Sequence, residues 1–412
     1  MLTELGRRDA ALYLIAGTLG SFGVGIAAFY LNFVYRGLGL SDLAIGALAA
    51  CQALGVVAGA LPAARFARRH PRRTSLLVGG TVTGAGLVGI VLLDAFPTLA
   101  LSAALVGGGG ILVSASGAAL LADASRGSGR VRLFGQQVAL GTAAVFLASV
   151  AAGALAAPVA GLLGLAPGDV RAVRALVALG AGLAALSGLP VLLLRPAAIP
   201  RAVQSAPVRR GLLVRFLAVE VAFGLGAGSF LPFVNLFFAD RFGVPFAALG
   251  IVLGTLAVAG SLGALAHGRL VVPRLGSLRG MVVTEAASLP FALAAAFAPL
   301  PLAVTLLAAR ALLMYGSSAT LNAYTLSSFT PAERAGASAT LSIGYYAAFA
   351  AGSLVSGTVR TALGDAGWTA NLATLALGYG LAAVLQLRLF RAHTPAGDAA
   401  GAIFRTAPDS TA

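Results

Sequence analysis

The segment from Val138 to Ala157, VALGTAAVFLASVAAGALAA, is twenty residues long and contains no charged side chain. A second such segment, ALVALGAGLAALSGLPVLLL, runs from Ala175 to Leu194, and similar runs recur along the whole chain. The hydrocarbon core of a bilayer is roughly 30 Å thick and takes about 20 apolar helical residues to cross. Backbone groups in lipid must pair with one another, which leaves helices or closed barrels, and these runs lack the alternation of barrel strands. They therefore predict membrane-spanning helices.

The composition of the whole chain also indicates a membrane protein. Of the 412 residues, 59% are hydrophobic and 10% are charged, whereas soluble domains carry roughly 25% charged residues. The formal charge of +15 would suit a nucleic-acid partner, but all 28 basic residues are arginines that cluster between the hydrophobic runs. Such arginines favour a topogenic role, because they hold loops on the cytoplasmic side. We expect no nucleic-acid partner.

The apolar runs predict twelve spans. They are residues 11–35, 42–64, 74–94, 97–122, 133–157, 172–194, 212–238, 246–271, 280–298, 300–326, 338–362 and 368–390. With the N-terminus inside, 22 arginines fall in cytoplasmic segments and five on the opposite side, while Arg310 lies within a span. This asymmetry predicts that both termini are cytoplasmic and that the protein resides in the cell (inner or plasma) membrane. The composition, rich in Arg, Ala and Gly, is typical of a GC-rich bacterial genome.

The longest polar interruption divides the chain into two halves. It reads RPAAIPRAVQSAPVRR and runs from Arg195 to Arg210. We therefore predict four parts: an N-terminal six-helix bundle (1–194), a cytoplasmic linker (195–211), a C-terminal six-helix bundle (212–390) and a cytoplasmic, disordered tail (391–412).

The two halves match at an offset of 203–204 residues. The matching pairs include Gly23 with Gly226, Gly25 with Gly228, Asn32 with Asn235, Gly46 with Gly250, Gly59 with Gly263, Arg65 with Arg269 and Arg130 with Arg334. Six spans separate the partners, so both halves enter the membrane in the same direction. Transporters built from duplicated halves hold their substrate near the midplane, between the repeats.

Twelve spans in two halves around a basic central loop resemble the major facilitator superfamily over essentially the whole chain. The loop after the second span, LPAARFARRHPRR, is similar to the glycine–acid–arginine motif of that family, with Arg69, Arg72 and Arg73 in the basic positions. Arg68 stands where the family has an aspartate, so the usual charge relay of this gate lacks its acid. The resemblance implies a gating or loop-anchoring set of Arg65, Arg69, Arg72, Arg73, Asp123, Arg130, Arg269, Arg274 and Arg334.

The fifth span contains G-x-x-x-A-P-x-x-G, formed by Gly153, Ala157, Pro158 and Gly161. This pattern is similar to the antiporter signature of exporters in the family. Small residues and a proline also serve generic close packing and bending of helices. Both interpretations stay open.

Two ionisable residues fall well inside predicted spans. Glu220 lies about two turns into the seventh span and Arg310 near the middle of the tenth. An ionisable group inside the bilayer costs roughly 3 kcal/mol or more and usually marks a pathway, and in the family the first, fourth, seventh and tenth spans line the cavity. One hypothesis makes Glu220 the proton-coupling residue, with Arg310 tuning it or meeting an anionic substrate. The alternative is a structural ion pair.

Uncharged polar residues complete the candidate cavity. They are Asn32, Ser114, Asn235, Ser317, Tyr324 and Tyr345. Asn32 and Asn235 are repeat partners, so they could offer paired amides to a substrate or instead hold helices together by hydrogen bonds.

Two further acids are expected to play structural roles. Glu285 lies about one turn inside the ninth span, where it could reach the interface or pair with Arg269 or Arg279. Asp42, preceded by Ser41, is an acceptable cap for the second span.

The sequence contains no phosphate-binding loop, no His and Cys cluster with metal spacing and no nucleophile–base arrangement, so we expect no enzyme, cofactor or metal. The leading hypothesis is an all-α secondary transporter, a monomer that exports a hydrophobic or amphipathic small molecule in exchange for protons. The alternatives are an uptake permease for a small metabolite, a lipid flippase or a non-transporting membrane receptor.

Overall fold

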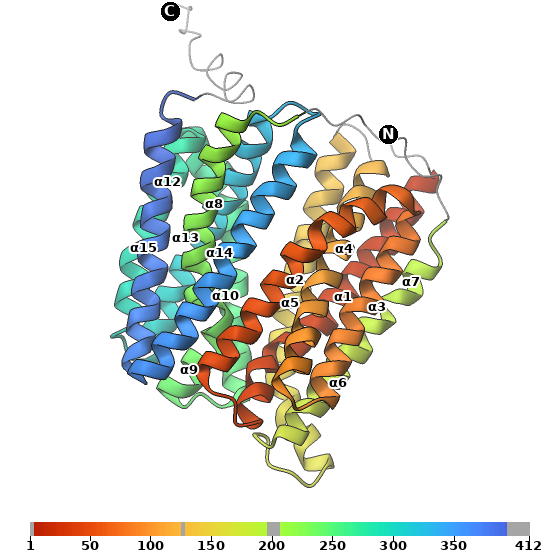
Figure 1. The fold of residues 1–412 in the computed structure, drawn as a ribbon, viewed down its shortest axis with the longest axis vertical. Coiled ribbons are helices and arrows are strands. Elements are labelled where there is room, and N and C mark those ends of the chain that lie inside the picture. The colour runs from red at the N-terminus through yellow and green to blue at the C-terminus, as the bar shows by residue number, and fades with distance from the viewer. Residues whose placement is uncertain (1–3, 125–127, 196–206, 394–412) are drawn as a thin grey trace, which may run out of the picture.

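The computed structural model describes residues 4–124, 128–195 and 207–393, which form an all-helical protein (Figure 1). In chain order the elements are α1 (Glu4–Gly37), α2 (Asp42–Arg69), α3 (Arg72–Leu92), α4 (Phe96–Asp123), α5 (Ser128–Leu162), α6 (Val170–Leu186), α7 (Gly188–Leu192), α8 (Arg210–Phe230), η1 (Leu231–Phe233), α9 (Val234–Phe242), α10 (Phe246–Ala266), η2 (His267–Val271), α11 (Val272–Leu275), α12 (Ser277–Ala295), α13 (Leu300–Ser328), α14 (Arg334–Leu363) and α15 (Ala366–Phe390). These elements make 12 segments long and apolar enough to cross a membrane, one for each predicted span. The predicted fold class is confirmed.

The helices form two bundles that lie side by side in Figure 1, the first coloured red to yellow and the second green to blue. Within the first bundle, α2, α3 and α4 pack as one three-helix unit, and α1, α5 and α6 pack as another. The second bundle repeats this division, with α10, α12 and α13 in one unit and α8, α14 and α15 in the other. Contacts between α2 and α14 and between α5 and α10 join the bundles.

Glycines make these two joints nearly identical. A side chain on Gly46 of α2 would come within 2.5 Å of a backbone oxygen of α14, and one on Gly250 of α10 within 2.4 Å of a backbone oxygen of α5. The neighbours are Ser353 and Gly357 for Gly46, and Ser149 and Gly153 for Gly250. Each of these residues stands 204 positions from its counterpart in the other joint. The sequence repeat is therefore a structural repeat about a pseudo-two-fold axis.

Two spans depart from regular α-helix. The seventh breaks at Pro232, where the short 3-10 turn η1 separates α8 from α9. The eighth widens into the π-helical turn η2, which begins at His267. Proline removes a helical hydrogen bond, which accounts for the first break.

Helix α2 begins as expected, but Ser41 caps it, accepting a hydrogen bond from the Ala44 N–H at 3.3 Å. The prediction that Asp42 is the cap is wrong.

Candidate functional site

Four charged residues join the bundles at the end of the molecule where α1 ends and α2 begins. Arg36 donates hydrogen bonds to Asp42 at 2.8 Å and to Asp240. Arg360 lies 3.4 Å from both of these aspartates. Arg36 and Asp42 belong to the first bundle, and Asp240 and Arg360 to the second. We call these four residues the ion-pair latch.

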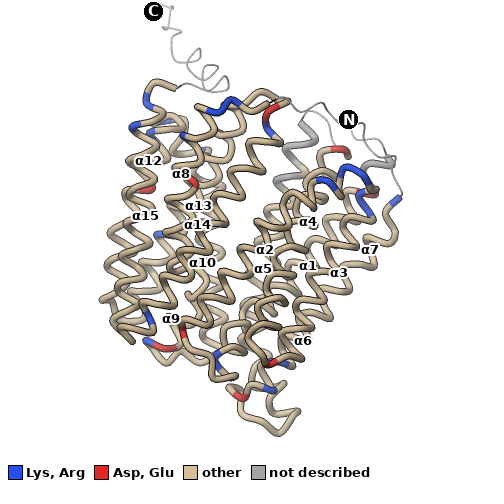
Figure 2. Tube along the Cα trace, in the orientation of Figure 1, with Lys and Arg blue, Asp and Glu red and all other residues tan. Residues whose placement is uncertain are grey.

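The latch was not among the sites predicted from the sequence, although the sequence contains a signal for it. Arg36 and Asp240 stand 204 positions apart, which makes them repeat partners of opposite charge. Equivalent positions near a pseudo-two-fold axis lie close to each other, so opposite charges there can pair. The repeat therefore indicates the contact between Arg36 and Asp240. Figure 2 shows how the charged residues gather at the two ends of the helices.

Asn32 and Asn235 lie next to the latch and hydrogen-bond to each other. The Asn32 amide donates to Asn235 Oδ1 at 2.8 Å and to the Pro232 carbonyl at 2.6 Å. Asn235 donates to the Phe29 carbonyl at 3.0 Å, and both side chains are buried. The pair therefore holds helices of opposite bundles together by hydrogen bonds. Neither residue lines the cavity described next.

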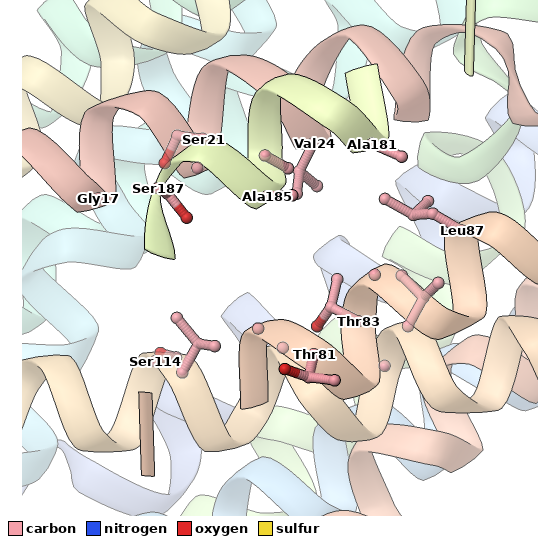
Figure 3. Close-up of a pocket in the computed structure, with 18 of the residues that line it drawn as sticks. Gly17, Ser21, Val24, Thr81, Thr83, Leu87, Ser114, Ala181, Ala185 and Ser187 are labelled. Carbon is pink, nitrogen blue, oxygen red and sulfur yellow. The ribbon is translucent and has the colours of Figure 1, made fainter. Parts of the chain in front are cut away.

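A cavity of about 1470 Å³ lies inside the first bundle, with α1 and α6 on one side and α3 and α4 on the other (Figure 3). It reaches the bundle interface, where Pro232, Tyr346 and Phe349 contribute to its wall. No charged residue is among the described residues that line it. Its polar groups are Tyr13, Thr18, Ser21, Gln52, Thr81, Thr83, Ser114, Gln137, Ser187 and Tyr346. Apolar side chains and glycines make up the rest of the wall.

Of the six predicted lining residues, Ser114 alone belongs to this wall. Ser317 is fully buried in the second bundle and donates a hydrogen bond to Glu285. Tyr324 donates to the His393 carbonyl at 2.8 Å near the end of the described chain. Tyr345 lies close to Glu220, and it is the next residue, Tyr346, that reaches the cavity.

Glu220 and Arg310 are not an ion pair. Glu220 is partly buried on α8. Arg310 is 5% exposed, and its guanidinium carbon lies 5.0 Å from the centre of the Tyr379 ring. Neither residue lines the cavity.

The structure contradicts the role expected for Glu285. Its side chain is 0% exposed, so it does not reach the interface. It accepts hydrogen bonds from Ser317 and, at 3.0 Å, from Gln386, and forms no ion pair with Arg269 or Arg279 in the described structure. The predicted position of Glu285 along the span is about right. The side chain, however, lies on the buried face of the helix and not on a face that reaches the interface.

The basic candidates lie at the end of the molecule opposite the latch. Arg72 donates to Asp123 at 3.1 Å, which ties α3 to α4. Arg334 donates to the Leu326 carbonyl at 2.8 Å, and Arg274 to the Leu270 carbonyl. Arg65, Arg69 and Arg269 are exposed and Arg73 partly buried, whereas the side chain of Arg130 lies outside the described residues.

A second carboxylate at this end is held within the second bundle. Arg209 donates to Glu333 at 3.0 Å, and Thr330 donates to the same carboxylate through its N–H and its hydroxyl. These hydrogen bonds, with that from Arg209 the largest, lower the pKa of Glu333 to about 2. Across the described ranges, no ion pair joins the two bundles at this end.

The G-x-x-x-A-P-x-x-G residues lie in different surroundings. Gly153 forms the α5–α10 joint described above. Pro158 and Gly161 are exposed, and a side chain on Gly161 would meet nothing within 4 Å. Close packing accounts for Gly153 alone.

Two pseudo-symmetric bundles, latched at one end and hollowed inside the membrane-spanning part, define a membrane transporter. The chain belongs to the major facilitator superfamily, whose family model matches residues 13–321. The family resemblance found in the sequence is therefore confirmed. The protein is a secondary transporter and not an enzyme.

Solved structures of transporters share the fold. A bacterial homologue of the human lysosomal transporter Spinster, inward-facing and unoccupied, is similar at TM-score 0.73 and 16% identity, covering 94% of this chain and 96% of its own. A mutant of the nucleoside transporter NupG is similar at TM-score 0.71 and 18% identity, covering 95% of this chain and 100% of its own. A bacterial homologue of the iron transporter ferroportin, inward-facing, is similar at TM-score 0.71 and 17% identity, covering 92% of this chain and 98% of its own. No curated relative matches the sequence.

Proposed function

We propose that this protein exports an uncharged, apolar or amphipathic small molecule across the cell membrane, in exchange for protons. The observation that carries the proposal is the uncharged wall of the 1470 Å³ cavity. Ligand pockets for drug-sized molecules measure roughly 300–1,000 Å³, so this cavity has room for such a molecule with some water.

The wall chemistry selects among substrate classes. Burying an ion without a partner of opposite charge costs several kcal/mol or more, and this wall offers no such partner. Apolar ligand surface gains roughly 25 cal/mol per Å² on leaving water. Hydroxyl and amide groups such as Ser21, Thr81 and Gln52 can orient a few polar atoms of the ligand. A neutral, largely apolar molecule fits best.

A divalent cation is disfavoured as cargo. In the described chain there is no group of three or more His, Cys, Asp or Glu residues that could hold a metal ion. None of the described residues that line the cavity is a carboxylate or a histidine. Hard cations need several oxygen ligands, of which carboxylates are the commonest.

Transport follows from opening and closing the two ends in turn. The latch and the Asn32–Asn235 pair close one end, and a cycle must break them. With cytoplasmic termini, as the arginine distribution favours, the latch faces the outside and the structure is open toward the cytoplasm. Export is favoured because an apolar compound enters a cell through the bilayer unaided, so that a pump adds most by removing it.

Gly84→Leu tests the cavity. Gly84 lines it, and a Cβ there meets nothing within 4 Å, so a leucine side chain enters the open space without displacing the backbone. Gly211→Leu is the matched control, because Gly211 is exposed on α8 and also has no neighbour within 4 Å.

The assay uses proteoliposomes with an imposed pH gradient and two dyes of similar size, one uncharged and lipophilic, one permanently cationic. We expect gradient-driven movement of the uncharged dye alone, lost in Gly84→Leu and kept in Gly211→Leu. Transport of the cationic dye, or an unchanged rate in Gly84→Leu, would overturn the assignment. Competition by nucleosides would instead favour uptake of a polar metabolite.

A further inference from the structure

The second bundle contains a buried polar cluster that the proposed cavity does not use. Glu285 on α12 accepts hydrogen bonds at one oxygen, Oε1, from Ser317 on α13 and from Gln386 on α15. Its other oxygen, Oε2, has no hydrogen-bond partner among the described residues, and neither has Oε1 of Gln386. All three side chains are at most 1% exposed. We call Glu285, Ser317 and Gln386, with Arg310 and Tyr379 beside them, the α12 cluster.

The α12 cluster fills the place that the first bundle leaves empty. Gly59 of α2 packs against Gly108 of α4 as Gly263 of α10 packs against Leu312 of α13. These contacts align the two bundles at an offset of 204. Gly23 lies against Gly180 and Ala184 as Gly226 lies against Leu375 and Tyr379, which aligns α6 with α15. The resulting pairs are Glu285 with Thr81, Arg310 with Val106, Ser317 with Val113, Tyr379 with Ala184 and Gln386 with Val191. All five partners in the first bundle line the cavity.

This comparison argues against a purely structural role. The first bundle folds with threonine, valine and alanine at the same five positions. Buried ionisable groups are poor stabilisers, because apolar residues of similar volume do as well or better. The second bundle therefore retains a carboxyl group that stability does not require, and intramembrane carboxyls mark functional sites.

We propose that Glu285 is the proton-carrying residue of this transporter and that Arg310 becomes its counter-ion when the proton leaves. This inference rests on the proposed proton-driven export. In the present conformation no cation pairs with Glu285 across the described chain, and a buried carboxylate without one costs several kcal/mol. The carboxyl is accordingly neutral. Rotating the Gln386 amide by 180° puts its oxygen in the same place, where it accepts the hydrogen bond of the acid.

The surroundings of Glu285 contain two other titratable groups and one cation. Arg310 on α13 lies over the ring of Tyr379 on α15, and Glu285 lies close to that tyrosine. The Nε of Arg310 has no hydrogen-bond partner in the described structure. His267 of η2 contacts Thr284, the residue before Glu285, at 3.3 Å. Proton loss thus leaves a carboxylate near a guanidinium that is held by Tyr379 and has a free N–H at Nε. The proton passes to water on the side then open.

The cluster also connects proton release to helix movement. Glu285 and Ser317 belong to the α10–α12–α13 unit, whereas Gln386 belongs to the α8–α14–α15 unit. Turning the carboxylate toward Arg310 breaks the bond to Gln386, which joins the two units. The same two units meet the first bundle through α10 and α14. A single proton can therefore alter a hydrogen bond between the two units that carry the joints.

Infrared difference spectroscopy of the full chain in liposomes tests the proton directly, without a known cargo. At neutral pH we expect the carbonyl band of a protonated carboxylic acid, with less intensity in Glu285→Gln and full intensity in Asp169→Asn, which removes a carboxylate from an ion pair at the end of the first bundle. Ser317→Ala should shift this band, because the hydroxyl that donates to the carboxyl is gone. A band whose intensity is the same in Glu285→Gln as in the unaltered protein, or no band in the unaltered protein, would refute the assignment.

The dye assay then separates this inference from the proposed function. Glu285→Gln should lose pH-driven dye movement by roughly tenfold or more while still exchanging dye without a gradient, and Asp169→Asn should keep both. If Glu285→Gln transports with an unaltered pH response, the coupling role fails although export stands. If no variant moves the dye, export of such compounds fails, and the infrared result still decides whether Glu285 holds a proton.

Discussion

Glu333 makes the electrostatics of a single residue testable. Its hydrogen bonds to Arg209 and Thr330 lower its pKa from 4.5 to about 2 in the folded protein. A lowered pKa means that the folded state favours the ionised form. The stabilisation is fully present above pH 4.5 and is lost as the pH falls toward 2. We expect Glu333→Gln to unfold at a lower temperature than the unaltered protein at pH 7, with a difference that shrinks below pH 4.5.

The control for this prediction is Asp365→Asn, which removes a largely exposed carboxylate at the other end of the molecule. It should leave the pH dependence in place. A Glu333→Gln protein with the same melting temperature at every pH would show that the ion pair contributes nothing, as many exposed pairs do.

Single residues were also the hardest scale to predict from the sequence. Asn32 and Asn235 are repeat partners in the sequence, but the sequence does not show that they meet each other across the axis. Glu285 was placed at about the right depth and on the wrong face, since a hydrophobic span shows little difference between lipid-facing and buried sides. The partners Ser317 and Gln386 come from other helices, which spacing within one helix cannot reveal.

Among the elements, the glycine joints make the sharpest prediction. A Cβ on Gly46 would lie within 2.5 Å of the Ser353 backbone, so Gly46→Ala must push α2 away from α14. Overpacking of this kind costs about 1–3 kcal/mol. The thermal unfolding temperature in detergent should fall, whereas Gly161→Ala, where nothing lies within 4 Å, should leave it unchanged or slightly raised. Equal stability of the two variants would contradict the joint.

The twelve helices were predictable because length and apolarity are local properties of the chain. The break at Pro232 and the π-helical turn at His267 were not predicted. The break has a local cause, the missing N–H of Pro232, whereas the π-helical turn lies against a residue of another helix, because Thr320 of α13 contacts His267 at 2.7 Å. The sequence likewise does not show which glycine of the G-x-x-x-A-P-x-x-G pattern meets another helix; in the structure it is Gly153 and not Gly161.

In the whole molecule, the duplicated halves were visible in the sequence and their difference was not. The repeat predicts a substrate between equivalent halves, yet the large cavity lies mostly within the first bundle. This asymmetry arises where Thr81, Val106 and Val113 replace the polar residues of the α12 cluster. Matching positions show a repeat, whereas the function proposed here depends on positions that do not match.

The latch makes a prediction about the whole molecule, because its residues join the two bundles and set the balance between conformations. Arg36→Gln and Asp240→Asn each remove part of the network, and a partly exposed pair is worth up to about 1 kcal/mol. That energy changes a two-state population roughly fivefold. Spin labels on cysteines at Leu163 and Leu363, which are exposed in opposite bundles, in a Cys51→Ala background should report longer distances in either variant.

The double variant separates a latch from two independent surface charges. If Arg36 and Asp240 act through each other, the double variant shifts the population by less than the sum of the single shifts. Asp169→Asn removes a hydrogen-bonded ion pair with Arg171 inside the first bundle at the same end of the molecule, so its distances should stay unchanged. Additive shifts, or an equal shift in Asp169→Asn, would mean that net charge at this end controls the conformation. The contact between Arg36 and Asp240 would then have no special part in closing it.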